Sequence, residues 1–117
     1  MRTKLVTLLG KEYWLAHSAQ SQMNLEAFRR QPGFSVATHG AQLGFETLCE
    51  TLRAGYRWAK LTGATPCNEP PAREDLADLL GEDDILAIVP AMNEVVTGER
   101  NVEANPPKKA GAKASDG

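Results

Sequence analysis

The sequence contains few aromatic residues, few cysteines and no long apolar run. Phenylalanine, tryptophan and tyrosine make up 6% of the 117 residues, so a hydrophobic core must consist mainly of aliphatic side chains. Two cysteines are too few for the disulfide framework of a small secreted domain. No stretch approaches the roughly 20 apolar residues of a membrane span, and the apolar N-terminal run is too short for a signal peptide. We therefore expect a cytoplasmic protein with reduced thiols and no membrane contact.

Charge is also limited, and it is unevenly distributed. The formal net charge is −2, without the cluster of Lys and Arg that neutralises phosphates, so we expect no nucleic-acid partner. Residues 69–84 carry seven acids and one base, a net charge of −6. The acids in this segment lack the alternating ligand positions of a calcium loop, and helix capping and solubility explain them better than a metal or catalytic site.

No catalytic or metal motif is recognisable. The sequence lacks a Gly-rich phosphate loop and a paired-cysteine metal motif. Together, His17, His39, Cys49 and Cys67 could supply four zinc ligands, but their spacing matches no zinc module. A nucleophile–base pair such as Ser18 with His17 has no third orienting group and no oxyanion loop. We expect neither an enzyme nor a bound metal or cofactor, and Cys49 fits best as a buried small hydrophobic residue.

The N-terminal segment 3–17 is predicted to form a β-hairpin. The expected strands span residues 4–9 and 12–17, with a turn at 10–11 where Gly10 accepts a positive φ. Alternation places Tyr13 and Leu15 on one face and Trp14 on the other. A two-stranded hairpin is marginal alone, so it must pack on helices or pair with another chain.

Four helices follow in the predicted secondary structure. They span residues 18–30, 40 or 41 to 61, 71–80 and 85–97. Ser18 is expected to cap the first helix, Asp83 or Asp84 the last, and Gly98 to end it. Pro90 is expected to kink the last helix. The predicted fold is thus mainly α with a short N-terminal β-hairpin (α+β), a small helical domain of about four helices.

Composition predicts where the folded domain ends. The predicted domain covers residues 1–98, and residues 99–117 are predicted to be a disordered tail, since the part from Asn105 carries no large apolar residue.

Within the longest helix, Gly44 and Gly55 are poor helix formers. They either permit the close approach of another helix or mark a break.

Broad apolar faces on the two longest helices suggest a protein-binding role. Apolar residues recur at helical spacing in both, and the face of helix 41–61 is wider than one stripe, which indicates contact with two neighbours, or with one neighbour and a partner protein. Trp, Tyr and Met suit such contacts, although core positions are the alternative for each. The candidate protein-binding residues are Trp14, Phe45, Tyr56, Trp58, Ile88, Met92 and Val96.

The order of short motifs resembles the phage tail assembly chaperones of long-tailed phages and prophages. Residues 6–15, VTLLGKEYWL, are similar to the family's N-terminal hairpin, and the run Leu52-Arg-Ala-Gly-Tyr56 is similar to one of its helix ends. Residues 73–80, REDLADLL, and the segment from Asp83 to Glu94 resemble its last two helices. The resemblance covers residues 4–98. The long 34–40 connection and Pro90 depart from the pattern.

The resemblance implies that the protein functions by binding other proteins. Members bind and solubilise the tape measure protein, help to recruit tail tube subunits, often form ring or helical homo-oligomers, and are absent from the mature virion. We therefore expect these partners and a location in the host cytoplasm. The alternative is a small cytosolic oligomeric adaptor or regulator unrelated to tails, which would have different genomic neighbours. A helical DNA-binding regulator is disfavoured because the candidate helices are acidic or mixed.

Overall fold

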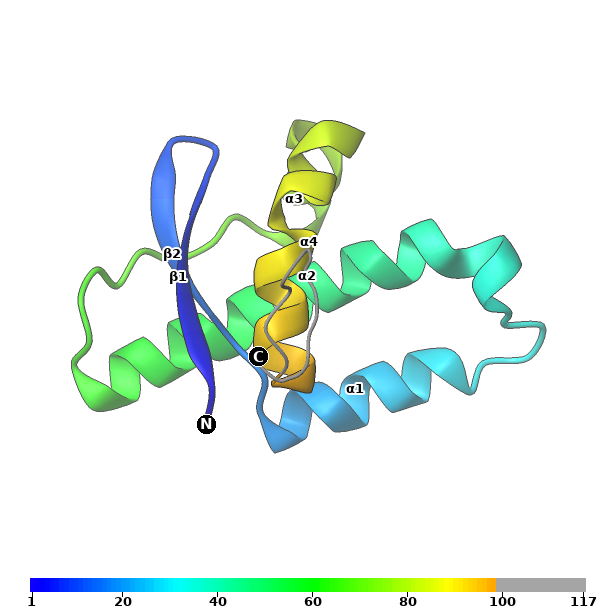
Figure 1. The fold of residues 1–117 in the computed structure, drawn as a ribbon, viewed down its shortest axis with the longest axis horizontal. Helices are drawn as coiled ribbons and strands as arrows, with labels where there is room; N and C mark the ends of the chain where they lie inside the picture. The colour runs from blue at the N-terminus through cyan, green and yellow to red at the C-terminus, as the bar shows by residue number, and fades with distance from the viewer. Residues whose placement is uncertain (99–117) are drawn as a thin grey trace, which may run out of the picture.

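The computed structural model describes residues 1–98. A two-stranded antiparallel hairpin at the N-terminus is followed by four helices (Figure 1). The elements are β1 (Thr3–Leu8), β2 (Lys11–Ala16), α1 (Ala19–Arg29), α2 (Val36–Thr62), α3 (Arg73–Leu79) and α4 (Glu82–Thr97). The predicted fold, mainly α with a short N-terminal hairpin, is confirmed. The predicted tail at 99–117 lies outside the described residues.

The hairpin turns one residue earlier than predicted. Leu8 pairs with Lys11, so the two central turn residues are Leu9 and Gly10 rather than Gly10 and Lys11. Both have positive φ, 53° and 79°, which is the combination that a type I′ turn requires between twisted strands. The sequence offers only one glycine here, and Leu9 accepts the strained position.

One face of the hairpin forms part of the core. Leu15 is fully buried and Tyr13 is 5% exposed, as alternation along β2 predicts. The core cluster joins the hairpin to three helices, mainly through aliphatic side chains, as the low aromatic content suggested. Its buried members are Leu8, Tyr13, Leu15, Leu48, Leu52, Leu76, Ile88, Met92 and Val95.

The longest helix, α2, begins earlier than predicted. Ser35 takes the N-cap position, and its hydroxyl accepts a hydrogen bond from the Thr38 backbone N–H at 3.2 Å. Non-helical angles at His39 (φ −117°, ψ 15°) mark a kink between the first turn and the rest of the helix. The predicted 34–40 connection is therefore mostly a capped helical turn, because Ser35 supplies an acceptor for the free N–H groups.

Gly55 lets α2 approach the hairpin closely. A Cβ atom at this position would lie 1.8 Å from the carbonyl oxygen of Trp14. A Cβ atom at Gly44, in contrast, would meet nothing within 4 Å. Close approach therefore applies to Gly55, but the element approached is strand β2 and not the helix that was expected.

The other helix ends follow local chemistry. Ser18 caps α1 as predicted, accepting from the Ser21 N–H at 3.1 Å, and Gly98 ends α4 in the left-handed conformation. The predicted cap of α4 was wrong: Gly81 is the N-cap, and Asp84 in the first turn accepts a hydrogen bond from its backbone N–H at 2.9 Å. Helix α3 begins at Arg73, two residues after the predicted Pro71.

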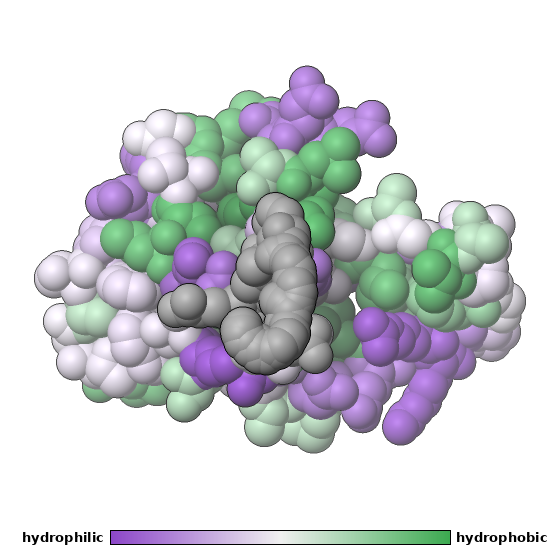
Figure 2. All heavy atoms as spheres, in the orientation of Figure 1, coloured by the Kyte–Doolittle hydropathy of each residue, from purple (hydrophilic) through white to green (hydrophobic). Residues whose placement is uncertain are grey.

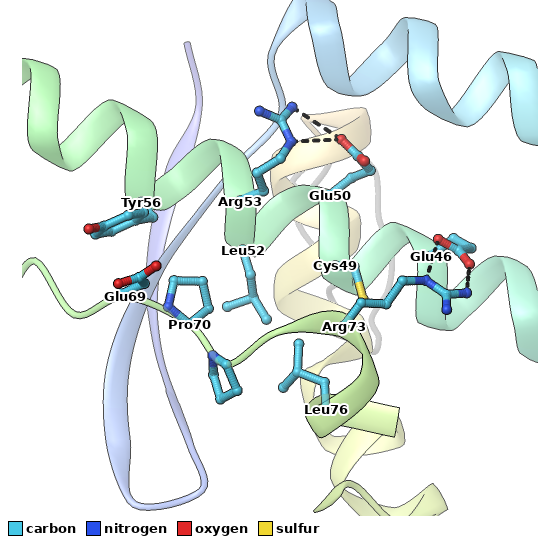
Figure 3. A pocket seen from close by; sticks show the side chains of 11 residues that line it. Glu46, Cys49, Glu50, Leu52, Arg53, Tyr56, Glu69, Pro70, Arg73 and Leu76 are labelled. Atoms are coloured by element: carbon cyan, nitrogen blue, oxygen red, sulfur yellow. Dashed lines mark hydrogen bonds and ion pairs between the residues drawn. The ribbon is translucent and has the colours of Figure 1, made fainter. Parts of the chain in front are cut away.

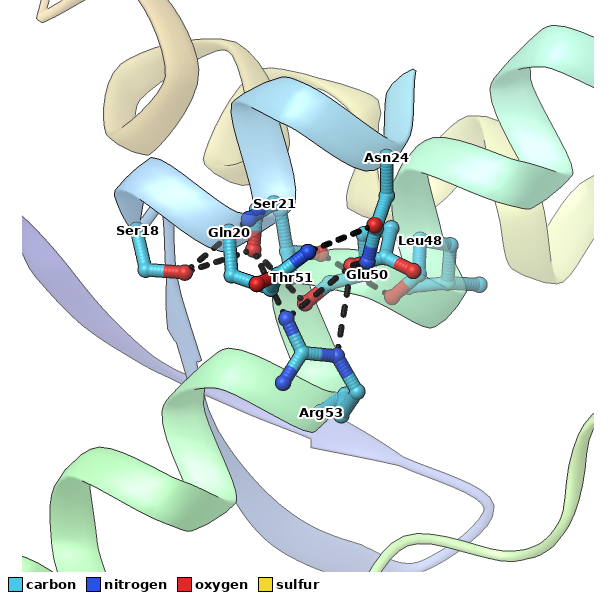
Figure 4. A network of polar contacts seen from close by, with 8 residues as sticks. All are labelled: Ser18, Gln20, Ser21, Asn24, Leu48, Glu50, Thr51 and Arg53. Carbon is cyan, nitrogen blue, oxygen red and sulfur yellow. Dashed lines mark hydrogen bonds and ion pairs between the residues drawn. The ribbon is translucent and has the colours of Figure 1, made fainter. Parts of the chain in front are cut away.

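A polar network attaches α1 to α2 (Figure 4). Ser21 is fully buried, and its hydroxyl lies 3.0 Å from Ser18 Oγ and 3.5 Å from the Glu50 carbonyl oxygen. Asn24 donates to the Glu50 carboxylate at 3.0 Å, and Arg53 donates to the same oxygen. Since these bonds satisfy a buried hydroxyl and a carboxylate, they fix the register of the two helices.

Candidate protein-binding surfaces

The structure separates the seven predicted binding residues into three places. Tyr56 lines a cavity on one side of α2, and Phe45 lies next to Arg73, another residue of the cavity lining. Trp14 and Trp58 form a pair beside the hairpin. The remaining three belong to α4 and lie in or against the core: Ile88, Met92 and Val96. The apolar surface of the molecule is likewise divided into several areas by charged side chains (Figure 2).

A cavity of about 350 Å³ lies between α2 and the segment 69–76 (Figure 3). Its apolar lining comes from both sides, because α2 presents every third or fourth residue and the two prolines of the connecting segment lie opposite. The lining residues are Glu46, Cys49, Glu50, Leu52, Arg53, Tyr56, Glu69, Pro70, Pro71, Arg73 and Leu76. The cavity therefore combines an apolar floor with charged groups.

Ion pairs border this cavity. Arg73 pairs with Glu46, which joins α3 to α2 and raises the pKa of the arginine above its usual range, mainly through their hydrogen bond. The same guanidinium lies 5.3 Å from the centroid of the Phe45 ring, a cation–π arrangement. Arg53 pairs with Glu50 at 3.1 Å, whereas Glu69 forms no ion pair within residues 1–98. The rim thus offers one unmatched carboxylate.

Cys49 contributes a thiol to the cavity wall. It is half-buried, close to the predicted role of a small hydrophobic residue. Burial raises its pKa to about 11, and the carboxylates of Glu46 and Glu50 add to the shift while Arg73 opposes it. Because the thiolate is the nucleophile, this thiol is unreactive near neutral pH.

Two tryptophans pack on the other face of the hairpin. The ring centroids of Trp14 and Trp58 are 5.1 Å apart with an interplanar angle of 67°, an edge-to-face contact. Both side chains are half-buried. Trp58 follows Tyr56 by two residues and therefore lies on nearly the opposite side of α2 from the cavity. The two predicted aromatic sites of this helix are thus separate surfaces.

The residues of α4 are largely internal. Ile88 is 5% exposed and Met92 3% exposed, both within the core cluster, and Val96 packs partly buried against it. This corrects the expectation that the apolar face of this helix is available to a partner protein. The hairpin and α2 cover that face, since their residues Leu8, Leu15 and Leu48 belong to the same core cluster.

A second groove, of about 280 Å³, lies between β1 and α4. It is lined by Val6, Thr7, Leu8, Leu9, Asp84, Ala87, Ile88 and Ala91. Sequence reasoning missed this groove and the cavity-lining residues Glu69, Pro70, Pro71 and Arg73. Residues in an irregular segment have no periodicity to reveal their direction, and the Arg73–Glu46 pair joins residues 27 apart.

Neither a membrane span nor a metal cluster is found in the described part of the chain. None of the helices within residues 1–98 is long and apolar enough to cross a membrane. The same residues bring together no group of three or more His, Cys, Asp and Glu side chains that could hold a metal ion. Comparison of the chain with known protein families, curated proteins and solved structures finds no match.

Proposed function

We propose that this protein is a phage tail assembly chaperone, which binds and solubilises the tape measure protein and helps to recruit tail tube subunits. It would act in the host cytoplasm, without catalysis or cofactor, and be absent from the mature virion. The order of motifs along residues 4–98 and the fold, a hairpin followed by four helices, support this proposal. The observation that carries it is the apolar cavity with a charged rim beside α2.

The cavity suits the side chains of a partner helix. Its volume of about 350 Å³ lies at the lower end of the ~300–1,000 Å³ typical of binding pockets. Leu52, Leu76 and Pro70 provide apolar walls. A long helical protein with apolar stripes aggregates when those stripes are bare, and docking side chains into such a cavity would cover them.

The charged rim would orient the bound helix. Arg53 and Arg73 already pair with Glu50 and Glu46, while Glu69 has no cationic partner within residues 1–98 and is exposed. A Lys or Arg of the partner, next to its apolar stripe, would meet Glu69 at the edge of the site. Rim charges influence association rate and orientation more than affinity, which suits a chaperone that accepts many similar helices.

Tyr56 is the most informative residue for testing this function. It lines the cavity, it is half-buried, and Lys60 lies 5.3 Å from its ring centroid. Aromatic side chains at such positions dominate binding energy. We expect Tyr56→Ala to weaken capture of the coexpressed tape measure protein at least tenfold, since truncation of a hot-spot residue costs about 2 kcal/mol or more. Arg57→Ala, at an exposed neighbouring position, is the matched control.

Pull-down yield and circular dichroism should be measured for both variants and for Glu69→Lys, which reverses the unmatched rim charge. Capture that is unchanged in Tyr56→Ala and Glu69→Lys, with both folded, would place the binding site elsewhere. Failure of the wild-type protein to bind the tape measure protein of its own phage would overturn the tail role. A gene located away from tail tube and tape measure genes would favour an adaptor or regulator unrelated to tails.

A further inference from the structure

The two edges of the hairpin differ in what covers them. The two-residue turn Leu9–Gly10 is closed by a hydrogen-bonded pair, Leu8 with Lys11. Hydrogen-bonded and non-hydrogen-bonded pairs alternate along an antiparallel ladder. The Leu5–Trp14 pair is therefore non-hydrogen-bonded, and the main-chain groups of both residues point outward, away from the partner strand.

The outer edge of β2 is occupied within the molecule. The Trp14 carbonyl oxygen faces Gly55 of α2, as the 1.8 Å distance to a built Cβ atom at that position shows. At the next outward position, Asn68 Nδ2 donates a hydrogen bond to the Glu12 carbonyl oxygen at 2.8 Å. In Figure 1, α2 crosses behind the hairpin. Another strand cannot pair with β2 while α2 and Asn68 remain in place.

The outer edge of β1 has no main-chain partner within residues 1–98. Its outward main-chain groups belong to Thr3, Leu5 and Thr7 by the same alternation, and none of them has a hydrogen-bond partner among residues 1–98. Two side chains hold the strand against α4: Arg2 Nε donates to the Val95 carbonyl oxygen at 3.2 Å, and Lys4 pairs with Glu94 at 3.1 Å. Natural proteins usually protect such an edge with proline, a bulge or a covering element.

We infer that β1 pairs with β1 of a second copy of this chain, forming a four-stranded antiparallel sheet across a two-fold axis at Leu5. The outward residues of β1 are Thr3, Leu5 and Thr7. Their order, Thr, Leu, Thr, is the same whether the strand is followed from its N-terminus or from its C-terminus. An isologous contact requires this kind of self-complementarity. Six intermolecular main-chain hydrogen bonds result, from three N–H donors in each copy.

Side chains on the outer face of the sheet match this pairing. The two Leu5 side chains lie opposite each other, and each is flanked by Trp14, the cross-strand neighbour of Leu5. Thr3 lies opposite Thr7 of the second copy, a favourable cross-strand pair. On the core side Lys4 lies opposite Val6, so no like charges are directly opposed, and Lys4 remains neutralised by Glu94.

The dimer is expected to be concentration-dependent. A six-residue strand edge alone buries less than the ~800 Å² per partner of a standard interface. The adjoining Leu5–Trp14 face adds apolar contact at the centre, where binding energy concentrates. This inference does not depend on the tail role: it specifies how two copies join, on a surface separate from the cavity beside α2.

Charged substitutions of Leu5, the residue at the two-fold axis, test the pairing of β1 with β1. Analytical ultracentrifugation of the full chain over a concentration series should show a monomer–dimer equilibrium. Leu5→Lys and Leu5→Glu each place like charges directly opposite and should weaken dimerisation about tenfold or more. An equimolar mixture of the two variants should restore the dimer. Wild-type protein that stays monomeric, variants that still dimerise, or a mixture that stays monomeric would each overturn the inference.

Cysteine cross-linking gives an independent measurement if those charged variants fold poorly. In a background with Cys49→Ala and Cys67→Ser, Leu5→Cys places two thiols across the axis, within the Cα separation that a disulfide allows. Thr7→Cys is the matched control, because its neighbour in the second copy is Thr3. Mild oxidation should give a covalent dimer for Leu5→Cys and not for Thr7→Cys; equal yields would contradict the proposed register. Tape measure capture measured in parallel separates this result from the proposed function.

Discussion

Gly55 of α2 faces the carbonyl oxygen of Trp14 so closely that a Cβ atom at position 55 would be 1.8 Å from that oxygen. This contact seats the longest helix against the edge of β2. It places Leu52 on the core side and Trp58 against Trp14 on the other side. The close approach thus determines which faces of α2 are internal and which remain available to partners.

Substituting Gly55 tests this approach. We expect Gly55→Ala to lower the free energy of unfolding by about 3 kcal/mol, because the new methyl group meets backbone that has to move. Gly44→Ala is the control in the same helix, with nothing within 4 Å of the built Cβ atom. It should raise stability by up to ~1 kcal/mol through helix propensity. Urea unfolding measures both; equal effects would show that α2 is not seated on β2 in this way.

The core position of α4 is tested by a second pair of variants. Met92 is 3% exposed and Leu86 is 60% exposed on the same helix. Met92→Ala should lower the free energy of unfolding by ~2–5 kcal/mol through lost burial and a cavity, whereas Leu86→Ala should change it by less than ~0.5 kcal/mol. Thermal unfolding followed by circular dichroism measures the difference. A stable Met92→Ala variant that binds the partner less well would return Met92 to the binding surface.

The raised pKa of Cys49 predicts that the stability of the fold depends on pH in the alkaline range. Its folded-state pKa is raised to about 11, above the ~8.5 of a thiol in an unfolded chain. Between these values the folded state holds the proton more tightly, so the contribution to stability is complete below pH ~8.5 and is lost as pH rises towards 11. Cys49→Ala should reduce this alkaline loss of stability, measured by urea unfolding at pH 8 and pH 10.

Thiol alkylation provides a separate check on Cys49. At pH 8, iodoacetamide should modify the exposed Cys67 well before the half-buried Cys49, because little of the latter is thiolate. Mass spectrometry of peptides resolves the two sites. Rapid modification of Cys49 at pH 8 in the folded protein would show that its surroundings do not raise the pKa.

The faces of the strands and the ends of the helices could be predicted where the signal lies within a few residues. Alternation in β2 identified the opposite faces of Tyr13 and Trp14, and Ser18 and Gly98 marked helix ends, since a cap depends on one side chain or one backbone conformation. The errors were equally local. Leu9 occupies a turn position with positive φ that no local signal predicts, and Ser35 begins a helix within a segment that was predicted to be a connection.

Binding residues were harder to predict, because an apolar stripe has the same spacing whether it meets this chain or another. Tyr56 and Met92 lie in similar patterns, yet one lines a cavity and the other is inside the core. The rim formed by Arg73 and Glu46 depends on residues 27 apart, which no local pattern connects. The seven candidates therefore divided among three environments.

The sequence by itself determined the order and type of the elements, an aliphatic core and most helix ends, because each depends on neighbours a few residues apart. Only the tertiary structure decided which apolar faces are covered and which edge of the hairpin is free. Those outcomes depend on where α2 crosses β2, through one glycine and one carbonyl group brought together from distant parts of the chain.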